Sequence, residues 1–237
     1  MATHRWENDD LLMSTDDDCR KLIALLAHEM RSPGAVVAGY LRMLKGPSSS
    51  EMPGREQKMI EEANRSCGRL LHIVQELSDF GELSAAQPEM KLAPLPIFAL
   101  CDDIVQEAGG EGADVTFVCD DADRDVMVDG HATRLKQAIS ALVASLVRER
   151  GSAPVEARGF VYRNTEGLAL IAFGDPGGAA DLIEVLKHQK TPFDRWRGGM
   201  GLSLPIAHRI VEVHGGAIWG LPGSRATCAL SLPLAPS

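Results

Sequence analysis

The chain has 237 residues, of which 45% are hydrophobic and 24% are charged, and its formal net charge is −9. This length allows two domains of modest size, and the composition is that of a folded globular protein rather than a disordered or fibrous one. The acidic balance, without a cluster of lysines and arginines, argues against nucleic acid binding, because nucleic acid phosphates require a basic surface.

No apolar run reaches the roughly 18 residues that a membrane-spanning helix needs, and the acidic N-terminus is unlike a signal peptide. We therefore expect no membrane insertion and a cytoplasmic location. The five cysteines are widely spaced and include no Cys-x-x-Cys pair. This spacing favours reduced thiols over a disulfide framework or a zinc site.

Two long helices are predicted in residues 14–86, after an N-terminal tail at 1–13. Ser14 and Asp17 have the spacing of a helix start, and the turn-forming residues 46–50 end that helix. Apolar residues at steps of three and four mark a packing seam on each helix. The seams hold Cys19, Ile23, Leu26, Met30, Pro33, Val37, Tyr40 and Leu44, and then Ile60, Ala63, Cys67, Leu70, Val74, Leu77 and Gly81. One hairpin leaves part of these seams uncovered, so we expect residues 14–86 to form a homodimeric four-helix bundle.

A second domain is expected at 90–237, after the helix-breaking residues 85–88. Helices are predicted at 95–108, 130–149, 180–189 and 203–214, and strands at 114–119, 125–128, 155–163, 167–173, 216–220 and 226–232. Mixed strands with interleaved helices predict an α/β sandwich. The expected fold class is therefore a helical hairpin followed by an α/β domain.

His28 is the first candidate functional residue. It lies two residues from the seam positions Leu26 and Met30, about 200° around the helix, and so faces outward. Glu29 offers a carboxylate for the imidazole proton, and Arg31 offers a cation for phosphoryl oxygens. Pro33 removes one helical hydrogen bond, so we expect a bend just after the histidine. An isolated exposed histidine on a helix commonly has no function, so its neighbours decide the interpretation.

These neighbours resemble a known motif. The segment 28–33, His-Glu-Met-Arg-Ser-Pro, resembles the phospho-acceptor box of the two-component sensor histidine kinase family. The resemblance implies that His28 attacks the γ-phosphate of ATP with Glu29 as base, and that the phosphate then moves to an aspartate of a response regulator receiver domain. Ser32 stands where family members with phosphatase activity often hold Thr or Asn. Gly34 departs from the usual apolar residue and costs about 1 kcal/mol in helix propensity.

The second domain resembles the ATP-binding domain of the same family, an α/β sandwich of the histidine kinase/gyrase ATPase type. Residues 198–216 resemble the second glycine box and the helix behind it, which approach phosphates, and residues 171–179 resemble the first glycine box, in which Asp175 would accept the adenine amino group. The resemblance therefore implies ATP as a cofactor. Its implied contacts are Asp175, Gly177, Gly199, Gly201 and Leu202. A simple β-turn at 175–177 is the alternative for the first box.

Residues 134–139 resemble the start of the family's asparagine box, but Ala141 and Ser145 stand where its two asparagines are expected. In the family the second asparagine holds Mg²⁺, so the resemblance leaves Ser145 as the candidate metal ligand and Arg148 as a candidate phosphate contact. Loss of one such group lowers a rate roughly 10²- to 10³-fold. We therefore predict a histidine kinase with weakened ATP chemistry. The alternatives are an inactive relative that serves as phosphotransferase, phosphatase or docking platform for a receiver domain, and an unrelated dimeric adaptor.

Overall fold

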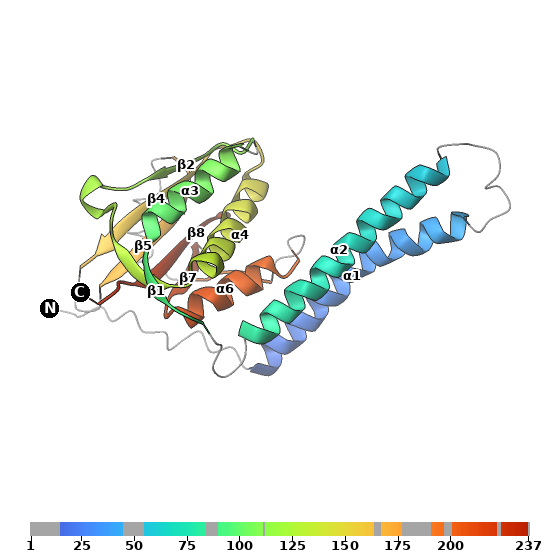
Figure 1. The fold of residues 1–237 in the computed structure, drawn as a ribbon, viewed down its shortest axis with the longest axis horizontal. Helices are drawn as coiled ribbons and strands as arrows, with labels where there is room; N and C mark the ends of the chain where they lie inside the picture. Colours follow the sequence, from blue (N-terminus) through green and yellow to red (C-terminus); the bar gives the residue numbers. More distant parts are fainter. Residues whose placement is uncertain are drawn as a thin grey trace. The chain divides into compact units, whose positions relative to one another are not determined.

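The computed structural model describes residues 15–44, 55–83, 90–110, 112–163, 167–176, 191–196, 201–221 and 224–236. The chain divides into two compact units, Met1–Leu77 and Ser78–Ser237, which Figure 1 shows in ribbon form. None of the helices in the described ranges is long and apolar enough to cross a membrane.

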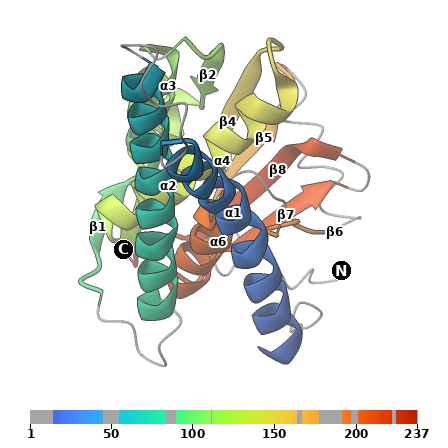
Figure 2. The ribbon, with the colours of Figure 1, turned by 90° about the vertical axis from the view of Figure 1, so that its right-hand side faces the viewer.

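The first unit contains the two predicted long helices, α1 (Thr15–Leu44) and α2 (Arg55–Leu83). They run antiparallel and cross at an angle (Figures 1 and 2). The helix α1 continues through Pro33, and in Figure 1 its second half takes a different direction from its first half. A proline inside a helix has this effect, because it removes one backbone hydrogen bond and its ring crowds the preceding turn.

Packing within the hairpin uses only part of the predicted seams. The described side chains that are buried on the two helices are those of Leu25, Pro33, Met59, Ser66, Ile73, Glu76 and Leu83, and of these only Pro33 is a predicted seam position. Seam residues such as Ile23, Ile60 and Val74 are exposed in the single chain. Each helix thus carries two adjacent apolar stripes, and a residue pattern alone does not tell which of them meets the other helix of the hairpin.

The second unit is built on a six-stranded sheet with the strand order β2-β4-β5-β8-β7-β6 and a separate antiparallel pair, β1-β3. Only β2 and β4 are parallel; the other neighbouring strands of the six-stranded sheet are antiparallel. The bounds are β1 (Ala93–Pro96), β2 (Val115–Val118), β3 (Met127–Gly130), β4 (Val155–Tyr162), β5 (Leu168–Gly174), β6 (Thr191–Pro192), β7 (Ala217–Leu221) and β8 (Ser224–Pro233). All seven residues of the central strand β5 are buried.

Three helices, α3 (Ile97–Gly110), α4 (Ala132–Arg150) and α6 (Ser203–Val213), lie on the same side of this sheet (Figure 2). Apolar residues at helical spacing on α4 supply much of the core: Leu135, Ala138, Ile139, Leu142 and Leu146 are completely buried. The helix starts where the Arg134 N–H donates to Nδ1 of the N-cap residue His131, at 3.5 Å, and ends at Gly151, whose φ is +62°.

The predicted α/β domain is confirmed, with local differences. Strand β1 was not predicted, because Pro94 and Pro96 argue against a strand; the short two-stranded pairing with β3 tolerates both prolines. Strand β3 lies two residues further along the chain than predicted. The helix predicted at 180–189 falls outside the described residues.

The end of α2, from Ser78 onward, belongs to the second unit. Leu83 is buried, and its carbonyl oxygen accepts a hydrogen bond from Nε of Arg209 on α6 at 2.8 Å. Nη1 of Arg134 on α4 lies 3.4 Å from Oδ2 of Asp79. A cation near the carbonyl end of a helix also interacts favourably with the helix dipole. Arg209 and Arg134 therefore bind the last residues of α2 to α6 and α4.

Candidate functional site

The predicted phospho-acceptor residues lie together on α1. His28, Arg31 and Ser32 are exposed, and Glu29 is half-buried. Pro33, one turn further, is buried. The helix thus turns the proline inward and holds the His28 imidazole in solvent, next in sequence to a carboxylate. This is the arrangement that the sequence predicted for a nucleophilic histidine with an adjacent base.

The asparagine-box positions lie in the middle of α4. Ser145 is only 1% exposed, and Ala141 is half-buried. Arg148 is exposed, three residues beyond Ser145. A serine hydroxyl is shorter than an asparagine amide, and this one is enclosed by protein. It is therefore a poor candidate for an octahedral Mg²⁺ site that keeps several waters.

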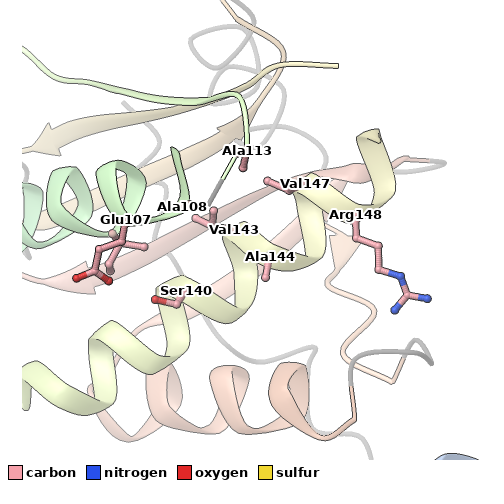
Figure 3. Close-up of a pocket in the computed structure, with 10 residues that line it drawn as sticks. Glu107, Ala108, Ala113, Ser140, Val143, Ala144, Val147 and Arg148 are labelled. Atoms are coloured by element: carbon pink, nitrogen blue, oxygen red, sulfur yellow. The ribbon is translucent and has the colours of Figure 1, made fainter. Parts of the chain in front are cut away.

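A cavity of about 530 Å³ lies between α3 and α4. Figure 3 shows Glu107 on α3 and Ser140, Ala144 and Val147 on α4 around it, with Arg148 extending away at one end. At 100° per residue, Ser140 and Val147 lie about 140° and 160° around the helix from Ser145. Ser145 therefore faces away from the cavity, although Arg148, the predicted phosphate contact, lies at its edge.

Asp175, the predicted adenine contact, follows the last residue of β5 and is 70% exposed. Its Oδ1 accepts a hydrogen bond from Nη2 of Arg150, the last residue of α4. The Nε–H of Arg150 donates to the carbonyl oxygen of Pro154 at 2.9 Å. The sequence analysis missed Arg150, because the two charged residues are 25 positions apart and no local pattern links them.

Two residues of the second glycine box are described, and they shape the start of α6. Gly201 has a φ of +59°, a conformation that side chains rarely adopt, and Leu202 is the completely buried N-cap residue. The leucine side chain has no acceptor atom, so the N-cap residue itself provides no side-chain capping hydrogen bond, and none is found within the described residues. A helix start without a capping side chain suits an anion such as phosphate. Gly177 and Gly199 lie outside the described residues.

Buried His214 joins the end of α6 to the start of α4. Its Nδ1 lies 2.7 Å from the carbonyl oxygen of Ile210, and its Nε2 accepts a hydrogen bond from the His131 N–H at 3.0 Å. This pairing fixes the neutral imidazole with the proton on Nδ1. Gly216 follows closely, and a Cβ there would lie 2.1 Å from the Ser231 carbonyl oxygen, so only glycine fits.

We expect the stability of the α/β unit to decrease at acidic pH through His214. Burial lowers the pKa of His214, and the nearby His131 lowers it further, against the opposing effect of the Ile210 carbonyl. The unfolded chain therefore takes up this proton first as the pH falls below about 6.5, and stability is lost with a slope of at most about 1.4 kcal/mol per pH unit. Urea unfolding of wild type and His214→Gln between pH 7.5 and 5 should show a flatter profile for the variant. Equal profiles would contradict this assignment.

The residues present fit a nucleotide better than they fit its usual metal ion. The start of α6 suits a phosphate group, and Asp175 offers a carboxylate at the end of a strand. Among the described residues, no cluster of three or more His, Cys, Asp or Glu side chains could hold a metal ion. Ser145 is enclosed, so it does not fit the octahedral Mg²⁺ that accompanies a nucleotide.

Comparisons with known proteins agree with both halves of the chain. Residues 20–86 match the His Kinase A (phospho-acceptor) domain family. The signal transduction histidine-protein kinase BarA of Escherichia coli is 24% identical over 211 residues, which cover 84% of this chain and 22% of BarA. The chain thus spans about a fifth of the length of BarA. The probable sensor histidine kinase TcrY of Mycobacterium tuberculosis is also 24% identical; the match covers 84% of this chain and 42% of TcrY.

The fold is shared with the histidine kinase ThkA, solved in complex with the response regulator protein TrrA. The TM-score is 0.62 at 20% identity, with 91% of this chain and 61% of that chain covered. Together, the matched domain, the relatives and the shared fold identify the chain as a two-component histidine kinase homologue, with a phospho-acceptor domain followed by an α/β domain of the histidine kinase type.

Proposed function

We propose that the chain is a histidine kinase core in which His28 accepts a phosphoryl group and passes it to an aspartate of a response regulator receiver domain. The exposed His28, placed beside Glu29 within the matched phospho-acceptor domain, carries this proposal. The imidazole nitrogen attacks phosphorus, the bond to the leaving oxygen breaks, and the imidazole proton passes to the Glu29 carboxylate. Arg31 and Ser32, both exposed on the same helix, stand near the transferred group. The ThkA complex with TrrA supports a receiver domain as the partner.

The working unit of the proposal is a homodimer formed through residues 14–86. An exposed apolar face of the hairpin supports this homodimer. The face consists of Ile23, Met30 and Leu41 on α1 and Ile60, Cys67, Leu71 and Val74 on α2. At 100° per residue, this face lies about 110° from the buried stripe on both helices, in the same rotational sense. The buried stripes of the two antiparallel helices face each other. An equal rotation away from them in the same sense therefore places the exposed apolar residues of both helices on the same side of the hairpin. A continuous apolar surface of this kind favours association with a second copy.

His28 lies about 100° from the buried stripe of α1 in the opposite sense, and therefore on the other side of the hairpin. Pairing through the exposed apolar face leaves the imidazole in solvent. A receiver domain can then reach His28 without opening the dimer. The cytoplasmic location predicted from the sequence is part of this proposal, as is the lack of nucleic acid binding.

ATP is the proposed phosphate source, used slowly. When bound, ATP supplies the γ-phosphoryl group. The first turn of α6, after Gly201 and Leu202, would bind its phosphates, and Arg148 would add a cation beside them. The Asp175 carboxylate would accept a hydrogen bond from the adenine amino group. The enclosed Ser145 weakens charge neutralisation at the phosphates, which costs roughly 10²- to 10³-fold in rate. The proposal therefore keeps autophosphorylation but makes it slow.

A second candidate function follows from the same enclosed Ser145 and from Ala141. The hairpin would take its phosphate from a charged receiver domain rather than from ATP, as a phosphotransferase, with the α/β unit as a structural partner. Exposed Ser32 also leaves a hydroxyl that can position water for phosphatase action on a receiver. In the phosphotransferase function His28 carries the phosphate, and in the phosphatase function Ser32 on the same helix acts on the receiver domain.

Two donors separate these functions. The purified chain is incubated with γ-³²P-ATP and Mg²⁺, and separately with a panel of receiver domains charged by ³²P-acetyl phosphate. We expect acid-labile label on the chain from both donors, slowly from ATP. Label from the receivers alone would establish the phosphotransferase. Absence of label from both donors would contradict a phospho-acceptor role altogether.

A further inference from the structure

The cavity between α3 and α4 has the size of a small-molecule site. Its volume of about 530 Å³ lies within the roughly 300–1,000 Å³ that ligand pockets occupy. Ile104 and Val143, each 2% exposed, line its inner part, whereas Ala144 and Arg148 line its exposed rim. The cavity therefore reaches from the surface of the α/β unit down to its apolar core.

Small residues keep this cavity open. Ala108 on α3 and Ala144 on α4 line it at positions where longer apolar side chains would fill the space. Gly112 follows the end of α3 with a φ of +94°, and its N–H donates to the Gly109 carbonyl oxygen at 3.0 Å. The Ala113 N–H donates to the Ala108 carbonyl oxygen at 3.1 Å. These bonds fix the rim at the end of α3 and occupy both N–H groups, so neither is available to a ligand.

The charges around the cavity favour a ligand with one negative charge. At one end the Glu107 carboxylate on α3 lies 2.5 Å from Nζ of Lys136 on α4, so its charge is already compensated. Arg148 lies at the other end, and Figure 3 shows its side chain pointing outward from the cavity. A ligand whose apolar part fills the cavity would emerge beside this guanidinium. A carboxylate at that point gains an ion pair, whereas an ammonium group is repelled.

We propose that the α3–α4 cavity binds an apolar monocarboxylate of the fatty acid type, with its hydrocarbon part inside the cavity and its carboxylate beside Arg148. The lining suits a hydrocarbon, because Ile104, Val143 and Val147 present apolar side chains to it. Two further buried methylenes should make decanoate bind up to about fifteenfold more tightly than octanoate. Arg148 is also the proposed phosphate contact, so the test uses no nucleotide and does not depend on the proposed phosphotransfer.

Two substitutions fill the cavity, and one removes its charge. Ala144→Trp places an indole in the space that the ligand needs, and Ala108→Leu fills the same space from α3. Ala132→Trp is the matched control, because it makes the same change at an exposed alanine about 18 Å earlier along α4, outside the cavity. Leu71→Gln controls for binding to the exposed apolar face of the hairpin. Arg148→Gln tests the ion pair.

The measurement is isothermal titration calorimetry of the purified chain with decanoate, octanoate and uncharged octanamide, and urea unfolding shows that each variant is folded. We expect one saturable decanoate site per chain in wild type, in Ala132→Trp and in Leu71→Gln, and none in Ala144→Trp or Ala108→Leu. Arg148→Gln should weaken octanoate binding up to about fivefold, the effect of one exposed ion pair, and leave octanamide binding unchanged.

Four results would contradict the proposal. Decanoate binding that persists in both cavity-filling variants would lie outside the cavity, and binding that is lost in Leu71→Gln would lie on the hairpin. Equal affinity of wild type for octanoate and octanamide would reject the pairing with Arg148. Folded wild type that binds none of the three probes would reject the site itself.

Discussion

Replacing His28 with glutamine is expected to abolish phosphorylation of the chain from either donor. Glutamine is similar in size and polar, but its amide nitrogen is not a nucleophile, so no phosphorus–nitrogen bond can form. His28 is exposed, and the change should alter the free energy of unfolding by no more than about 0.5 kcal/mol. The measurement is acid-labile ³²P on the protein, accompanied by urea unfolding to show that the variant is folded.

The matched control is His72→Gln. His72 is also exposed on a helix of the hairpin, and its Nδ1 lies 3.6 Å from Oε2 of Glu76. It thus has a carboxylate nearby, as His28 does, but stands outside the His-Glu-Met-Arg-Ser-Pro segment. We expect full labelling of this variant. Label that persists in His28→Gln, or that disappears only in His72→Gln, would show that another histidine is the acceptor.

The helical hairpin and the α/β unit could be predicted because their signals are local. Apolar residues at a helical period predict the buried face of α4, and the turn-forming residues after Leu44 separate two long helices. The exposed position of His28 follows in the same way, since helix geometry fixes the direction of a residue relative to Leu26 and Met30. Strand β1 was missed because its partner β3 lies about 30 residues away, and only that pairing outweighs its two prolines.

The nucleotide half of the site was less predictable, because its properties come from contacts across the fold. Ser145 reads as a possible oxygen ligand in the sequence, but its burial is set by the helices and strands around α4. Asp175 reads as a free acceptor, and its pairing with Arg150 depends on the end of α4 meeting the end of β5. A sequence motif shows which residue stands at each position, whereas the folded structure shows whether its polar atoms are accessible to a ligand.

Val74→Glu is expected to convert a dimer into monomers. Val74 belongs to the exposed apolar face of the hairpin and is 53% exposed in the single chain. In a two-fold dimer through this face, one substitution places two carboxylates in the interface. Each buried, unpaired charge costs several kcal/mol, so the dimer dissociation constant should rise at least about a thousandfold.

Gln75→Glu is the control, because it adds the same charge one residue further, about 100° from Val74 around α2, at the solvent-exposed edge of the apolar face and not within it. Sedimentation equilibrium should give twice the 25.5 kDa chain mass for wild type and for Gln75→Glu, and the single mass for Val74→Glu. Ile73 is buried within the hairpin, whereas the exposed side chain of Val74 can contact a second chain. If Val74→Glu stays dimeric, the two chains do not meet through this face, and the accessibility of His28 in the dimer would have to be explained by another arrangement.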